Sequence, residues 1–328
     1  MQWLGDARHF NVPFGDIVYT ATARRQLYSF RLAVTARDKD QLIRALDTAP
    51  VTPVEPHGGH VIFVFSGQGS PYLNMGGSLY ATSPVFRSCI DRCQRCLISL
   101  GYSGILPIIS SETSDCVFGP DEEFEAYQCA ILAVEFALSS LWKHWGVVPA
   151  AVIGQSLGEY ATMVTAGVLS QRYAIGKTGI VSINFPSAQV EVTLTADMSF
   201  SNVTVADPLK NYEISLQVPL GFHSFAMDQI LDDLRDHFAT LPVHPPSIPI
   251  ASNVCGTVVP VGDSLTFQAD YFAKHCRQPV SFARGLRGLE QYLDPSQIEA
   301  WIDVGPHAIC LPMIEIPCPM QIKLDKLD

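Results

Sequence analysis

The chain has 328 residues, of which 48% are hydrophobic and 16% charged, so it is long and apolar enough to bury a sizeable core. Its formal net charge of −11 argues against nucleic acid as a general partner, because binding phosphates requires a basic face. The N-terminus has no secretory signal and no stretch reaches the ~18 apolar residues of a membrane span. We therefore expect a cytoplasmic protein that binds no membrane.

The nine cysteines are an odd number with irregular spacing. Cys93 and Cys96 form a Cys-x-x-Cys pair, but no second pair completes the four ligands of a structural zinc site. We expect reduced thiols, typical of an intracellular protein, and no bound metal.

The first part of the chain, residues 1–56, is predicted to be a small linker-like α/β segment. It contains a strand-like run at 28–36 and an amphipathic helix pattern at 37–49. The Pro- and Gly-rich stretch at 50–59 that follows marks a boundary.

Strand and helix patterns then alternate. The continuous apolar run at 60–70 is typical of a strand buried on both faces of a parallel sheet, and it ends in a glycine-rich turn. A nearly all-round apolar helix is predicted at 127–146, a core strand at 149–155 and a helix directly after it. This succession indicates a layered α/β fold. Residues 171–219 contain strand-like runs with little helix between them, and the alternation resumes from 220.

The second strand ends in Gly154-x-Ser156-x-Gly158, the spacing of a sharp strand-to-helix turn that exposes a nucleophilic serine. Glycines on both sides prevent collisions of Cβ atoms with the neighbouring strand and helix. The following helix N-terminus and the N–H of Leu157 would both favour negative charge developing there. An ordinary serine in a tight loop is the alternative interpretation.

A nucleophilic serine needs a base, and histidine is the usual one. His223 stands at the end of an apolar run and directly before a helix, a position at the carboxyl edge of a sheet. His307 also follows a predicted strand, but a Pro-His turn is as often structural.

Several motifs occur in one order along the chain and carry a family resemblance. They are "FVFSGQGS", "YQCAILAVEFALSSLW", "VIGQSLGEYATMVTAGVLS", "GFHSFAM", "HCRQPVSF" and "WIDVGPHA". Together they resemble malonyl-CoA:acyl carrier protein transacylases, and most of all the acyltransferase domain of fungal non-reducing polyketide synthases.

The resemblance implies an α/β-hydrolase-like core with a parallel sheet at 57–172 and 220–328. Between them, residues 173–219 would form a reduced ferredoxin-like small subdomain. It also implies transfer of a malonyl or other short acyl group from coenzyme A to the phosphopantetheine thiol of an acyl carrier protein. Both thioesters are substrates, and no bound cofactor is expected.

The same resemblance implies catalytic roles. Ser156 would be the nucleophile and His223 its general base, oriented by a backbone carbonyl in the loop 277–282. The backbone N–H groups of Gln68 and Leu157 would form the oxyanion hole.

Substrate-binding residues follow from the resemblance as well. Gln128 would be a hydrogen-bond donor near the site, with a polar residue at a helix start as the alternative. The bulk of Phe222 would exclude a 2-methyl branch. Gln155 stands where the family has histidine, and Thr178 stands where it has the arginine that binds the malonyl carboxylate. Arg172 is a candidate replacement for that arginine; a solvated surface charge is the alternative.

The interval from Ser156 to His223 is too short for the arginine helix and a complete ferredoxin-like lobe. Three explanations remain open: an acyltransferase for an uncharged acyl group, a degenerate fragment, or a rebuilt lobe in which Arg172 or Lys177 restores carboxylate binding.

Two other classes of function remain as alternatives. A serine hydrolase or thioesterase would need an acid between Ser156 and His223, and Asp197 and Asp207 are the candidates. A non-catalytic domain would not depend on Ser156 at all. Docking of an acidic carrier protein would need a local basic patch. Our candidates for this patch are Lys274, Arg277, Arg284 and Arg287.

Overall fold

The computed structural model describes residues 2–9, 11–25, 32–49, 59–68, 71–110, 120–172, 174, 222–314 and 321–322. It divides the chain into two compact units, Met1–Gly58 and Gly59–Asp328. The predicted small subdomain, including Lys177, Thr178 and Asp197, lies outside the described residues except for Ala174.

The described part of the first unit is helical. Asp38 caps its last helix by accepting a hydrogen bond from the Gln41 N–H at 2.7 Å. The strand predicted at 28–36 is wrong for residues 32–36, which pair with no other strand. An isolated extended run gains no ladder hydrogen bonds, and the described part of this unit offers it no partner. The elements are α1 (Gln2–Gly5), η1 (Ala7–His9), α2 (Phe14–Ala23) and α3 (Lys39–Thr48).

The second unit is built on a mixed sheet whose described strands have the order β4-β3-β2-β1-β5-β6. They are β1 (His60–Phe65), β2 (Ala151–Gly154), β3 (Ile250–Ala251), β4 (Val258–Val259), β5 (Ile298–Asp303) and β6 (Gln321–Ile322). All neighbouring pairs are parallel except β3 and β4. The α/β prediction is confirmed, with one correction to the expected parallel sheet. A short turn joins β3 to β4, and such a connection can only make an antiparallel pair.

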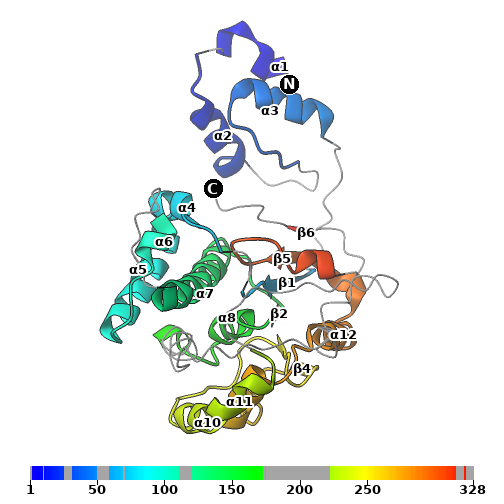
Figure 1. The fold of residues 1–328 in the computed structure, drawn as a ribbon. Helices are drawn as coiled ribbons and strands as arrows, with labels where there is room; N and C mark the ends of the chain where they lie inside the picture. Colours follow the sequence, from blue (N-terminus) through cyan, green and yellow to red (C-terminus); the bar gives the residue numbers. More distant parts are fainter. Residues whose placement is uncertain are drawn as a thin grey trace, which may run out of the picture. The chain divides into compact units, whose positions relative to one another are not determined.

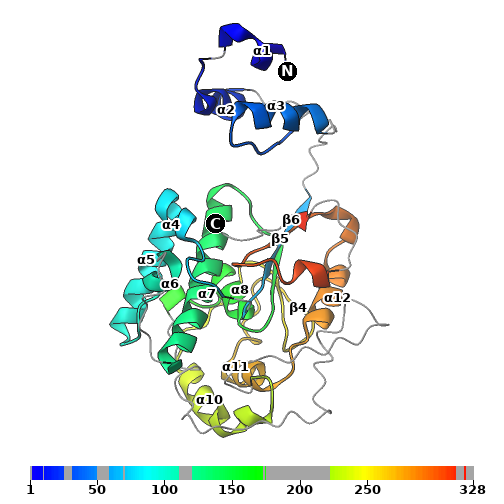
Figure 2. The same cartoon turned by 45° about the horizontal axis from the view of Figure 1, so that its top comes forward.

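Strand β1 explains why its sequence is continuously apolar. Phe63 and Phe65 point into one core cluster, and Ile62 and Val64 into the other, so both faces of the sheet are buried. Helices α4 to α8 lie on one side of the sheet and α12 on the other (Figures 1 and 2). The helices are α4 (Gly77–Thr82), α5 (Pro84–Ser99), α6 (Leu106–Ser110), α7 (Pro120–His144), α8 (Gly158–Thr165), α10 (Leu231–Ala239), α11 (Ala269–Arg277) and α12 (Phe282–Tyr292), with short turns η2 (Phe225–Ile230), η3 (Pro295–Gln297) and η4 (Leu311–Met313).

Helix α7 contains the segment Glu122–His144, which by length and composition could cross a membrane. However, 78% of its most apolar window is buried inside the protein, as expected of a core helix. It packs against α5 and α8, and its apolar side chains form much of the larger core cluster.

Candidate active site

The candidate nucleophile lies on a tight turn between β2 and α8. Ser156 has a φ of 51°, in the left-handed region that non-glycine residues rarely adopt. A Cβ atom on Gly154 would lie 2.3 Å from the Gly158 carbonyl carbon, and one on Gly158 would lie 2.4 Å from the Phe65 oxygen. The turn can therefore close only with glycine at both positions.

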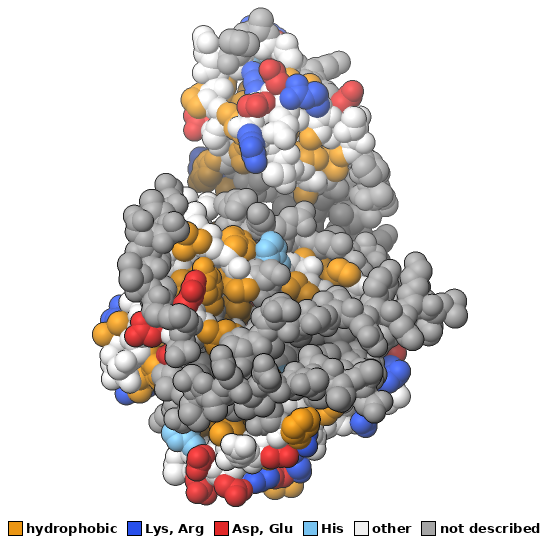
Figure 3. Space-filling model, viewed as in Figure 1, with side chains coloured by type: hydrophobic (Ala, Val, Ile, Leu, Met, Phe, Trp, Pro, Cys, Tyr) orange, Lys and Arg blue, Asp and Glu red, His pale blue; other side chains and the backbone are white. Residues whose placement is uncertain are grey.

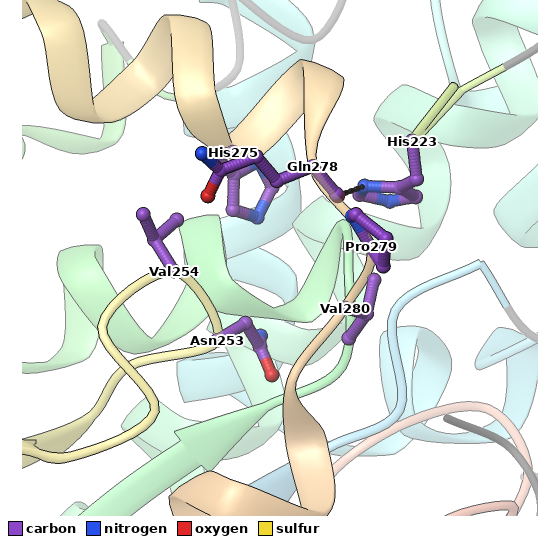
Figure 4. Close-up of a pocket in the computed structure, with 7 residues that line it drawn as sticks. All are labelled: His223, Asn253, Val254, His275, Gln278, Pro279 and Val280. Atoms are coloured by element: carbon purple, nitrogen blue, oxygen red, sulfur yellow. Dashed lines mark hydrogen bonds between the residues drawn. The ribbon is translucent and has the colours of Figure 1, made fainter. Parts of the chain in front are cut away.

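The structure brings the hydroxyl of Ser156 and the imidazole of His223 together. Their Oγ and Nε2 atoms are 2.6 Å apart, although 67 positions separate the residues in sequence. On the other side of the ring, Nδ1 is 3.0 Å from the carbonyl oxygen of Gln278, within the predicted loop (Figure 4). Because a carbonyl can only accept, Nδ1 carries the proton and Nε2 accepts the hydrogen bond from Ser156.

The imidazole of His223 is held as a neutral base. Burial and, to a smaller extent, the charge of the neighbouring His275 side chain lower its pKa to about 4, whereas the carbonyls of Gln278 and His275 and the charge of Glu159 act in the opposite direction. The ring is therefore unprotonated near neutral pH and can accept a proton from Ser156.

The turn after β1 forms the wall beside the nucleophile. Gly67 has a φ of 67°, and a Cβ atom there would lie 2.2 Å from the Gln155 oxygen and 3.3 Å from the Leu157 nitrogen. Gln68 thus follows a residue that contacts the nucleophile turn at 154–158, which we call the elbow. The N–H of Gly67 donates to the Oε1 atom of Glu135 at 2.7 Å, which fixes the turn from below.

The remaining predicted substrate residues differ in their surroundings. Gln128 is buried on α7, and Phe222 is half-buried against the larger core cluster. The Oε1 atom of Gln155 lies 3.6 Å from the Sγ atom of Cys310, so this side chain points toward the segment after β5. Arg172 is exposed and forms no ion pair with another described residue.

Two of the candidate basic residues are neutralised by acidic neighbours. Lys274 pairs with Asp270 at 2.7 Å, and Arg277 pairs with Asp228. Side chains of both signs gather over α10 and α11 rather than forming a basic patch (Figure 3). Within the described ranges, no group of three or more His, Cys, Asp or Glu side chains is arranged to hold a metal ion.

A polar network beneath the nucleophile turn was not predicted from the sequence. The carboxyl of Glu159 is fully buried and accepts hydrogen bonds from the Asn253 N–H at 2.9 Å and the Tyr271 hydroxyl at 2.6 Å, and its Oε2 atom lies 3.1 Å from His275 Nε2. His223, His275, Asn253 and Gln278 also line one small recess (Figure 4). The sequence did contain one signal for this network: Glu159 stands at the start of a helix whose other residues are uncharged and mostly buried. A buried charge without partners is not tolerated, so such a glutamate indicates hydrogen-bonding partners nearby.

Residues 62–182 match the family model described as the acyl transferase domain. Together with the α/β architecture, this match shows that the chain carries an acyl transferase domain.

Relatives along nearly the whole chain are fungal non-reducing polyketide synthases. Orsellinic acid synthase ArmB of Armillaria ostoyae is 38% identical over 96% of this chain and 16% of its own length. Non-reducing polyketide synthase ZEA1 of Gibberella zeae is 32% identical over 100% of this chain and 18% of its own length. The chain thus spans less than a fifth of these relatives. The second alignment runs over 368 positions against 328 residues here, so that relative has about 40 residues without a counterpart in this chain.

Solved structures share the fold. The acyl transferase domain of SpnD, solved in complex with 2-(pent-4-yn-1-yl)malonyl, superposes with a TM-score of 0.74 at 22% identity, over 98% of this chain and 84% of that one. An acyl carrier protein S-malonyltransferase from Vibrio cholerae gives a TM-score of 0.60 at 18% identity, over 80% and 96%.

Proposed function

We propose that this domain moves a malonyl or other short acyl group from coenzyme A to the phosphopantetheine thiol of an acyl carrier protein, in polyketide or fatty-acid type biosynthesis. The contact of 2.6 Å between Ser156 Oγ and His223 Nε2 carries the proposal, because it joins a nucleophile to a neutral base. The names of the relatives, orsellinic acid synthase and non-reducing polyketide synthase, support the pathway class.

In the first half-reaction, Ser156 Oγ attacks the thioester carbonyl and its proton passes to Nε2 of His223. The developing oxyanion accepts hydrogen bonds from the N–H groups of Leu157 and Gln68. The C–S bond then breaks, and the thiol of coenzyme A leaves with the proton from His223. This leaves the acyl ester on Ser156 and a neutral imidazole.

The second half-reaction runs the same steps in reverse with a different thiol. The phosphopantetheine thiol gives its proton to His223 and attacks the acyl ester, and Ser156 recovers the proton as the ester bond breaks. Coenzyme A thioester and phosphopantetheine are thus substrates rather than cofactors, and a cytoplasmic location fits them.

Four further residues are proposed to contact or select the acyl group: Gln128, Phe222, Gln155 and Arg172. Phe222 directly precedes the base, so its bulk is well placed to limit the size of the acyl chain. The division into a linker-like segment at 1–56, the core and a reduced subdomain at 173–219 is part of the same proposal.

Hydrolysis is the weaker alternative. A hydrolase of this kind orients its histidine with a carboxylate, whereas the oxygen 3.0 Å from His223 Nδ1 is the Gln278 carbonyl. A non-catalytic domain would have no reason to keep Ser156 in a strained conformation.

Intact-mass spectrometry after separate incubation with malonyl-CoA and acetyl-CoA tests the proposal. We expect a mass gain for one acyl group that is absent in Ser156→Ala, and its loss when a carrier protein with free phosphopantetheine is added. Release of the acyl group without carrier protein would indicate a hydrolase, and no mass gain with either thioester would reject the transfer.

A further inference from the structure

A second histidine, His275, lies directly beneath the candidate catalytic pair. It is buried at the C-terminal end of α11, and its ring centroid is 5.8 Å from that of His223. Its Nε2 atom is 3.1 Å from the carbonyl oxygen of Ser156 and 3.1 Å from Oε2 of Glu159. One donor therefore links the nucleophile turn to a buried carboxyl group.

The carboxyl of Glu159 is surrounded by hydrogen-bond donors. Every hydrogen bond to its two oxygens comes from a donor, either the Asn253 N–H and Nδ2 or the Tyr271 hydroxyl, and His275 Nε2 lies 3.1 Å from Oε2. A group that only accepts at both oxygens is an ionised carboxylate. A fully buried carboxylate is costly unless a cation faces it, and His275 is the side chain placed to supply that charge.

The end of α11 also holds the base. The N–H of His223 donates to the Cys276 carbonyl at 2.9 Å, and Nδ1 donates to the Gln278 carbonyl. From His275 to Gln278, this helix end thus contacts Ser156 through the His275 side chain and His223 through two backbone carbonyls. Figure 4 shows the contact between Gln278 and His223. Both halves of the pair are fixed relative to one element.

We propose that His275, as an imidazolium paired with Glu159, is a positioning residue that holds the Ser156 turn and places a fixed positive charge beside His223. This inference rests on the catalytic pair of the proposed function, but it concerns the activation of Ser156 rather than the substrate. The charged and polar groups that face His223 from the described elements are the Ser156 hydroxyl, the Glu159 carboxyl from α8, the side chain and carbonyl of His275 from α11, and the carbonyls of Cys276 and Gln278.

The two charges act on His223 in opposite directions. A positive charge at His275 disfavours protonation of His223, and the negative charge of Glu159 favours it. The direction in which the pKa of His223 shifts therefore depends on which of the two charges is removed, and a purely structural defect would not reproduce this difference.

The test measures the reaction of Ser156 with a fluorophosphonate between pH 3.5 and 9. In this reaction Oγ forms a bond to phosphorus, fluoride leaves and the proton passes to His223. The probe needs no acyl-CoA, so activation of Ser156 can be demonstrated even if the proposed transfer fails.

The acid limb is the fall of the reaction rate at low pH, and the plateau is the constant rate above it. In His275→Gln the amide can still donate to the Ser156 carbonyl. We expect the midpoint of its acid limb to rise by at least half a pH unit and its plateau rate to stay within about threefold of the wild type. In His275→Leu, we expect the same shift and a plateau at least tenfold lower.

Glu159→Gln should leave the acid limb where it is or lower it. Tyr271→Phe is the matched control, because it removes one hydrogen bond to Glu159 without changing a charge; its acid limb should coincide with that of the wild type even if its melting temperature falls. Equal limbs in the wild type and His275→Gln would overturn the proposal, as would shifts of the same sign in His275→Gln and Glu159→Gln.

Discussion

Ser156 and His223 both have positive φ angles, 51° and 61°, and their side chains meet at 2.6 Å. Such a conformation costs on the order of 1–3 kcal/mol per residue and persists only where neighbours enforce it. Here the enforcing contacts come from the end of α11: His275 Nε2 holds the Ser156 carbonyl, and the Cys276 carbonyl holds the His223 N–H. Strain at two residues far apart in sequence is thus maintained by one helix end.

The pH dependence of acylation should reflect the unusual base. The pKa of His223 is lowered to about 4, mainly by burial, so the neutral form that accepts the Ser156 proton persists well below pH 6.5. We expect the rate of acyl-serine formation, followed by rapid quench and intact mass, to stay level from pH 8 down to about pH 5 and to fall near pH 4. A midpoint near 6.5 would show that the imidazole is not desolvated.

Replacing Gly67 by alanine should disable the site. The new Cβ atom would lie 2.2 Å from the Gln155 oxygen and 2.6 Å from the Gly158 nitrogen, and the backbone already has a φ of 67°. The turn must move, and the Gln68 N–H moves with it. We expect acylation at least a hundredfold slower, on the scale seen when one oxyanion donor is lost, roughly 10²–10³.

Gly101→Ala is the control for this variant. Gly101 also has a positive φ, 85°, but a Cβ atom there meets nothing within 4 Å. It should show the backbone cost of about 1 kcal/mol without loss of acylation. Comparable losses of acylation rate in both variants would mean that backbone strain at a positive φ, rather than the contacts of Gly67 with the elbow, causes the loss.

The sequence predicted those parts of the fold whose signal is local. The apolar run of β1 is buried on both faces, and Gly154 and Gly158 are required wherever a strand meets a helix so closely. The pairing of Ser156 with His223 was inferred from their common position at strand ends and from the family resemblance.

The rest depended on contacts that no local pattern contains. Glu159 and His275 are 116 positions apart, and each by itself resembles an ordinary polar residue on a helix. The strand expected at 28–36 failed for the opposite reason: its pattern was right for a strand, but its described residues have no partner strand. Short antiparallel β4 escaped prediction because two residues carry no periodicity.

Truncation of Phe222 should broaden acyl selection. This aromatic side chain is half-buried against the core and directly precedes the base. Removing its bulk in Phe222→Ala opens space beside His223, and we expect methylmalonyl-CoA loading to rise roughly tenfold relative to malonyl-CoA. Competition between the two thioesters, measured by intact mass, gives the ratio directly. An unchanged ratio would mean that Phe222 does not contact the acyl group.

Arg172 offers a test of carboxylate recognition. The sequence left open whether this guanidinium binds the malonyl carboxylate or is a solvated charge, and the structure places it on the surface. A solvated charge contributes little, so we expect the malonyl-to-acetyl loading ratio of Arg172→Ala to stay within about twofold of the wild type. A selective loss of malonyl loading would instead assign the carboxylate to this residue.

Glu135 should support the turn at Gly67-Gln68, which carries the proposed oxyanion donor, as a neutral acid. Burial raises its pKa well above the ordinary value of 4.5, while its Oε1 accepts the Gly67 N–H at 2.7 Å. Glu135→Gln keeps an acceptor of the same shape, so we expect near wild-type acylation at pH 7. Glu135→Leu leaves the buried N–H unpaired, at a cost of about 1–3 kcal/mol in unfolding free energy, and should slow acylation.

The two variants also differ from the wild type in pH dependence. A carboxyl whose pKa is raised by folding contributes its full stability below pH 4.5 and loses it as the pH rises toward the folded value. The unfolding free energy of the wild type should therefore decline relative to that of Glu135→Gln above pH 4.5, as followed by urea denaturation at several pH values. If the wild type gains stability relative to Glu135→Gln over that range, Glu135 is ionised in the folded protein and holds the turn as an anion instead.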